Sequence, residues 1–113
     1  MPTTDTIHTA PEAEQRIEQA LDELYAVFAR LDDTALVRDF LGCLFTPVEL
    51  HDVAKRWLLV KEIDRGTPQR EIAKMFNMSL CKITRGSREL KKTDSAFRKV
   101  LAMLAAEAAE QPE

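Results

Sequence analysis

The chain has 113 residues, of which 45% are hydrophobic and 31% charged, and its formal net charge is −3 at pH 7. These values are typical of a globular domain. The sequence also argues against a membrane protein, because no apolar run approaches the roughly 20 residues needed to span a bilayer. The first residues lack the basic and apolar regions of a signal peptide, so we predict a cytoplasmic protein.

The charge is unevenly distributed along the chain. Residues 1–54 hold 3 Lys and Arg against 11 Asp and Glu, whereas residues 55–92 hold 11 against 4. A basic surface is therefore expected on an acidic protein, and such a surface favours nucleic acid. The chain contains two cysteines, Cys43 and Cys81, and two histidines, His8 and His51. Their spacing matches no metal-binding motif. We predict no metal and no cofactor.

The chain is predicted to be all-α, with six helices in one domain over residues 11–110. Residues 1–10 are predicted to be a disordered arm, and residues 111–113 a frayed tail. A long first helix begins near Pro11. Its apolar residues recur at spacings of three and four: Ile17, Leu21, Leu24, Phe28 and Leu31. Residues 32–34 break this pattern, and a second helix runs over about residues 36–44.

The third helix has a strong start signal. Thr46 can cap it, Pro47 suits the first turn, and Glu49 completes a capping box. Gly66 is its expected stop. The apolar spacing predicts that this helix turns four residues inward: Val53, Trp57, Val60 and Ile63.

Two short helices and a last one follow. We expect the short helices over about residues 68–75 and 79–90, and the last helix from about residue 95. Asn77 lies between the short helices, where the turn requires a left-handed residue. Ser79 can cap the second of them.

The two short helices fit a helix-turn-helix over about residues 68–91. Residues 69–90 read QREIAKMFNMSLCKITRGSREL. The inner face is predicted to consist of Ile72, Phe76, Met78 and Ile83, and Ala73 is small where the helices cross. An ordinary helical hairpin with a solvated basic face is the alternative. It would require the charge concentration, the small residue and the turn residue to coincide by chance.

Several short motifs resemble the Trp repressor family over about residues 36–104. They are Thr46-Pro47, Arg56, Gln69-Arg70-Glu71, Leu90-Lys91 and above all Ile83-Thr84-Arg85-Gly86-Ser87. The resemblance implies an intertwined homodimer with two projecting helix-turn-helix heads. It also implies a transcriptional repressor that binds a double-stranded DNA operator, with L-tryptophan as corepressor.

The resemblance further implies a corepressor site. Arg56 and Arg85 would sandwich the indole and hold the carboxylate, and Gly86 would contact the indole edge. Three more residues would line the site near the ammonium: Cys43, Phe45 and Thr46. Glu89 stands where the family has a serine that meets the amino group. It either binds the ligand ammonium or pairs with Arg85 four residues earlier.

DNA contacts are expected from both helices of the motif. Arg70 is expected to contact a guanine or a nearby phosphate. Gln69 and Lys82 are expected to anchor the DNA backbone. The other candidates are Thr84 and Lys91 for phosphates, and Leu80 and Cys81 for base edges.

Other functions remain open from the sequence. They are a DNA-binding regulator without ligand control, a regulator answering a different small ligand, and a module that binds acidic proteins through its basic face. We do not expect an enzyme, because no Ser-His-Asp set, phosphate-binding loop or carboxylate pair at suitable helical spacing occurs.

Overall fold

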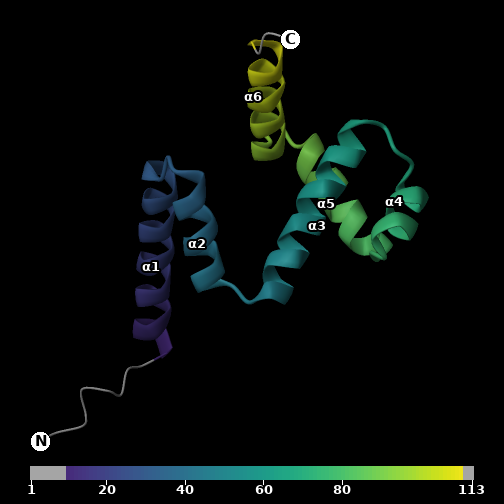
Figure 1. Cartoon of the computed structure of the whole chain (residues 1–113). Helices are drawn as coiled ribbons and strands as arrows, with labels where there is room; N and C mark the ends of the chain where they lie inside the picture. The colour runs from purple at the N-terminus through teal and green to yellow at the C-terminus, as the bar shows by residue number, and fades with distance from the viewer. Residues whose placement is uncertain (1–9, 111–113) are drawn as a thin grey trace, which may run out of the picture. The chain divides into compact units, whose positions relative to one another are not determined.

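A computed structural model describes residues 10–110, where it contains six α-helices and no strand (Figure 1). The all-α prediction with six helices is thus confirmed. Ala10 already belongs to the first helix, while the rest of the predicted arm and the predicted tail lie outside the described residues. The chain divides into two compact units, residues 1–45 and 46–113, which we describe separately.

The first unit is a pair of helices, α1 (Ala10–Arg30) and α2 (Thr34–Leu44). The Asp33 carboxylate caps α2 by accepting the Ala35 N–H at 3.1 Å. The rings of Phe28 and Phe40 pack at a tilt of 51° with centroids 5.5 Å apart. This aromatic contact joins the two helices, as the predicted break at residues 32–34 allows.

The first unit has no buried core of its own. Neither α1 nor α2 contains a buried residue in the described chain. Much of the predicted apolar stripe lies open instead: Ile17 is 58%, Leu21 44% and Phe28 36% exposed, while Leu24 and Leu31 are half-buried. An apolar face of this extent normally marks an interface.

The second unit begins with α3 (Pro47–Asp64), which starts with the predicted capping box. The Glu49 N–H donates to the Thr46 hydroxyl at 3.2 Å, and the Thr46 N–H donates to the Glu49 carboxylate at 2.9 Å. Pro47 occupies the first turn, where a missing N–H costs nothing. The helix ends before Gly66, whose φ of 90° favours glycine.

The prediction of which α3 residues face inward was partly wrong. Val60 is buried as expected, and Trp57 and Ile63 are half-buried, but Val53 is 48% exposed. The central buried residue is Leu59, which was not among the predicted inward residues. The reason is that α5 crosses the C-terminal half of α3 (Figure 1), so the buried surface begins beyond Val53.

The helix-turn-helix consists of α4 (Gln69–Phe76) and α5 (Leu80–Lys91). Asn77 adopts the predicted left-handed conformation with φ 52°, and the Ser79 hydroxyl caps α5 by accepting the Lys82 N–H. Ile72 and Ile83 are 0% exposed and pack with Leu59. The remaining predicted inner residues are half-buried against this cluster: Ala73, Phe76 and Met78.

The last helix, α6 (Ala96–Glu110), follows a turn in which Asp94 has a φ of 60°. The Ser95 hydroxyl accepts the Arg98 N–H at 3.2 Å and so caps the helix one residue before its start. The Arg98 guanidinium also pairs with Asp64 at the end of α3. Like α1, α6 contains no buried residue along its described length.

Candidate ligand pocket and DNA-binding face

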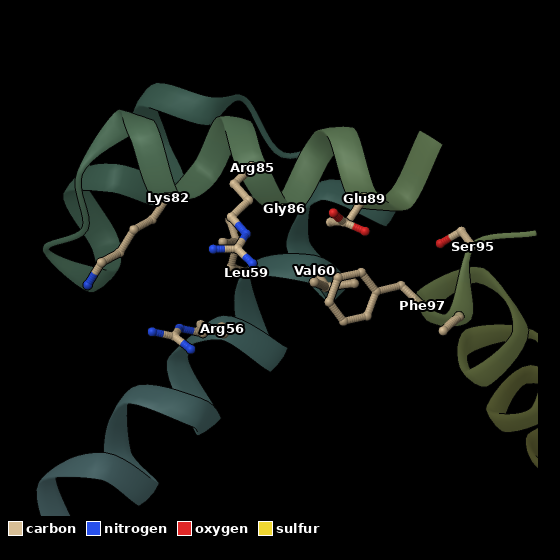
Figure 2. A pocket seen from close by; sticks show the side chains of 10 residues that line it. Arg56, Leu59, Val60, Lys82, Arg85, Gly86, Glu89, Ser95 and Phe97 are labelled. Carbon is tan, nitrogen blue, oxygen red and sulfur yellow. The ribbon is translucent and has the colours of Figure 1, made fainter. Parts of the chain in front are cut away.

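A pocket of about 520 Å³ lies between α3, α5 and the start of α6 (Figure 2). Its volume falls within the range of small-molecule sites, roughly 300–1,000 Å³. All its walls belong to the second unit. The lining residues are Arg56, Leu59, Val60, Lys82, Arg85, Gly86, Glu89, Ser95, Ala96 and Phe97.

The pocket has an apolar floor and two chemically different ends. Leu59, Val60 and Phe97 supply the apolar surface. Along α5, Lys82 and Arg85 come first and Glu89 follows nearer to Ser95, while Arg56 lies below Arg85 on α3 (Figure 2). One end is therefore cationic, and the other carries the only acidic side chain among the lining residues.

Helical spacing brings these side chains to the same pocket. Lys82, Arg85 and Glu89 follow one another at intervals of three and four residues, so they share one face of α5. Across residues 10–110 the structure shows no salt bridge to Arg56 or Arg85. Both guanidiniums are therefore available to an anionic group in the pocket.

Glu89 pairs with Lys92. The alternative prediction, a pair between Glu89 and Arg85, is wrong. The Lys92 ammonium donates to the Glu89 carboxylate at 2.8 Å. This hydrogen bond is the main reason that the pKa of Glu89 is lowered, and the charges of Lys92 and Arg85 add to it against the opposing effect of burial. Glu89 is thus held ionised beside the pocket.

Gly86 allows α5 to approach α3 closely. It is buried, and a Cβ at this position would lie 3.2 Å from Leu59 Cδ2 and 3.7 Å from Ile63 Cδ1. The resemblance to the Trp repressor family had implied that Gly86 contacts the indole edge of a ligand. The structure adds a packing reason, because the contact with Leu59 exists without any ligand.

We expect Gly86→Val to lower the free energy of unfolding by about 1–3 kcal/mol, the usual cost of overpacking a tight core. The measurement is urea denaturation. Gly42→Ala in α2 is the matched control, because nothing lies within 4 Å of a Cβ there. It should stabilise by about 0.5–1 kcal/mol through helix propensity. A neutral Gly86→Val would contradict the close helix crossing.

The other residues predicted for the corepressor site do not line this pocket. Thr46 uses its hydroxyl to cap α3, and Cys43 is exposed on α2. Phe45 is the C-cap of α2, so it belongs with Cys43 to the first unit. Three lining residues were not predicted for this site: Leu59, Val60 and Phe97. The first two lie three and four residues after Arg56, a spacing that could have indicated them.

The outward surface of α5 carries three of the seven predicted DNA contacts, Leu80, Cys81 and Thr84. A depression on this surface is lined by Leu80, Cys81, Thr84, Arg85, Arg88, Glu89 and Lys92. Arg88 and Lys92 were not predicted, although they follow Thr84 at four and eight residues. We call the part of this surface made by Leu80, Cys81, Thr84, Arg88 and Lys92 the reading face.

The other four predicted DNA contacts lie in three different places. Gln69 and Arg70 are exposed in the first turn of α4, and Lys91 is exposed at the end of α5. Lys82 lines the ligand pocket and a smaller cavity of about 120 Å³ beside Lys55 and Arg56. The structure thus places Lys82, a predicted contact to the DNA backbone, next to Arg56, a predicted contact to the ligand.

No cluster of three or more His, Cys, Asp or Glu residues among residues 10–110 is arranged to hold a metal ion. None of the helices described is both long and apolar enough to cross a bilayer.

These features define a helix-turn-helix protein with a ligand-sized pocket directly behind its second helix. Comparisons with known proteins agree. The sequence model described as Trp repressor protein matches residues 19–105. A Trp operon repressor homolog of Xylella fastidiosa is 32% identical over 74 residues, which cover 65% of this chain and 80% of the relative.

Two chlamydial proteins are similar to the same degree. The Trp operon repressor homolog of Chlamydia trachomatis is 31% identical over 65% of this chain and 79% of its own length. That of Chlamydia caviae is 29% identical over 79% of this chain and 89% of its own length. No solved structure matches with significance. The chain belongs to the Trp repressor family, a family of transcriptional repressors.

Proposed function

We propose that this protein is a sequence-specific DNA-binding repressor that L-tryptophan activates as corepressor. The observation that carries the proposal is the pair of arginines without salt-bridge partners in the described chain, Arg56 from α3 and Arg85 from α5, which line one apolar pocket. A guanidinium can stack on an aromatic ring and can also hold a carboxylate. Tryptophan offers both groups.

The other pocket residues support an aromatic amino acid. Leu59, Val60 and Phe97 provide apolar surface for the indole. Glu89 is ionised and lies toward the other end of the pocket from Lys82, so it is suited to bind the ammonium (Figure 2). Glu89 pairs with Lys92 rather than Arg85. The carboxylates of Glu89 and of the ligand therefore do not compete for the Arg85 guanidinium.

The position of the pocket supports control of DNA binding by the ligand. It lies between α3 and α5, so a ligand there contacts both the supporting helix and the reading helix. A ligand that binds best to one orientation of α5 shifts the population toward that orientation. We assign the reading face to the major groove, with Gln69, Arg70, Lys82 and Lys91 as further contacts to phosphates and bases.

The proposed repressor is a homodimer. No residue described in α1, α2 or α6 is buried, and their exposed apolar side chains include Ile17, Tyr25 and Met103. A second copy of the chain would cover this surface. Two-fold symmetry would then place two reading heads about 34 Å apart, one turn of DNA.

One observation favours a second candidate, a repressor that answers a different small ligand. Lys82 adds a third cation to Arg56 and Arg85 at one end of the pocket, which is more positive charge than a single carboxylate requires. An anion with two negative charges and an apolar body would use all three. Calorimetry with such a ligand and with L-tryptophan distinguishes the two candidates.

The test begins with duplexes selected from a random-sequence pool in the presence of L-tryptophan. We expect L-tryptophan to tighten binding to the selected duplex by about 5–150-fold, the usual range of allosteric coupling. Sedimentation of the same sample should show a dimer. Equal binding with and without L-tryptophan would indicate a ligand-independent regulator. Absence of DNA binding would leave a protein-interaction module.

A further inference from the structure

Glu89 lies on the boundary between the ligand pocket and the reading face. It lines the pocket, and it also lines the depression on the outward side of α5. Its hydrogen-bond partner Lys92 does not line the pocket but lines the outward depression, together with Thr84 and Arg88. One carboxylate is therefore within reach of both a ligand and a residue that belongs to the DNA-binding surface.

We propose that Lys92 is a DNA contact under ligand control. Glu89 holds the Lys92 ammonium while the pocket is empty. The ammonium of a bound amino acid takes the Glu89 carboxylate and releases Lys92 to a DNA phosphate. This inference rests on the proposed function, since it assumes an amino-acid ligand and a DNA partner.

The charge layout of the pocket determines how an amino acid would lie in it. Arg56, Lys82 and Arg85 attract the carboxylate to the cationic end. Glu89 lies one helical turn beyond Arg85, toward Ser95 and Phe97 (Figure 2). The ligand ammonium is thereby directed to the only carboxylate that lines the pocket.

The Glu89–Lys92 pair is of a kind that a ligand can displace. Its partners are three residues apart, and their side chains are 41% and 61% exposed. Exposed ion pairs between flexible side chains are weak, because water and salt screen them and both side chains lose freedom. A ligand ammonium is positioned by the arginine-bound carboxylate, so it loses less freedom when it replaces Lys92.

Lys92 is well placed to bind a phosphate once it is released. It is the C-cap of α5 and follows Arg88 by four residues on the reading face. A lysine that neutralises one phosphate steepens the dependence of log K on log salt by about 0.9. L-tryptophan is net neutral, so it contributes no such change through its own charge.

The first experiment needs no DNA. Lys92→Gln removes the competitor for Glu89 and should tighten L-tryptophan binding by about two- to five-fold, the usual effect of an exposed ion pair. Titration calorimetry measures this change. Lys91→Gln is the matched control, since Lys91 is exposed beside Lys92 and absent from the pocket. It should leave L-tryptophan affinity unchanged.

The second experiment measures salt slopes of DNA binding with and without L-tryptophan. We expect L-tryptophan to steepen the slope of the unmodified protein by about one unit more than that of Lys92→Gln. Lys91→Gln should reduce the slope equally with and without ligand. Glu89→Gln should steepen the ligand-free slope, but this effect should be absent when Lys92→Gln is also present.

The outcomes separate this inference from the proposed function. If L-tryptophan does not bind or does not strengthen DNA binding, the proposed function fails, and the inference fails with it. If L-tryptophan activates DNA binding but Lys92→Gln shows the full ligand-induced steepening, only the inference is overturned. A ligand-free effect of Glu89→Gln that persists without Lys92 would also overturn it.

Discussion

Replacing Ile83 by alanine should lower the free energy of unfolding by about 2–5 kcal/mol, the range found for buried isoleucine and leucine. Ile83 is 0% exposed and packs with Leu59 and Ile72 where α3, α4 and α5 meet. The truncation leaves a cavity that these neighbours cannot fill without moving the helices. Because whole domains are stable by about 5–15 kcal/mol, this loss is a large fraction of the total.

Urea denaturation with linear extrapolation measures the loss at Ile83. Leu80→Ala is the matched control, because Leu80 begins the same helix and is 54% exposed. It should change stability by less than about 0.5 kcal/mol, as surface substitutions do. Both variants should be compared at one protein concentration, since dimerisation links stability to concentration. Equal losses in the two variants would contradict the assignment of the core.

Replacing Arg56 by glutamine should weaken L-tryptophan binding by about 10–100-fold. A hydrogen bond to a charged group contributes about 1.5–3 kcal/mol, and each 1.4 kcal/mol corresponds to a factor of ten. Arg56 is the cleaner of the two arginines to test, because it comes from α3 and lines the pocket but not the depression on the outward side of α5. Arg85 lines both.

Titration calorimetry measures the affinity of the Arg56→Gln protein. Lys61→Gln is the matched control, because Lys61 is an exposed cation on the same helix that does not line the pocket. It should bind L-tryptophan as the unmodified protein does. DNA binding by Arg56→Gln should recover at high L-tryptophan concentration. An unchanged affinity would place the ligand carboxylate elsewhere.

The sequence by itself determined where the helices begin and end. Thr46, Pro47 and Glu49 start α3 as predicted, and Asn77 and Ser79 form the turn and cap of the helix-turn-helix. These signals are local, because a cap or a left-handed turn satisfies backbone groups within a few residues of itself. The motif of residues 83–87 likewise indicated the family that the comparisons confirmed.

Only the tertiary structure decided which side chains meet. Leu59, rather than Val53, is central to the core because α5 crosses the later turns of α3. Glu89 bonds to Lys92, although Arg85 lies at an equally suitable helical spacing. A helical pattern limits a side chain to one face, but the neighbouring helices and the competing partners determine its contacts, and these depend on packing between segments far apart in the chain.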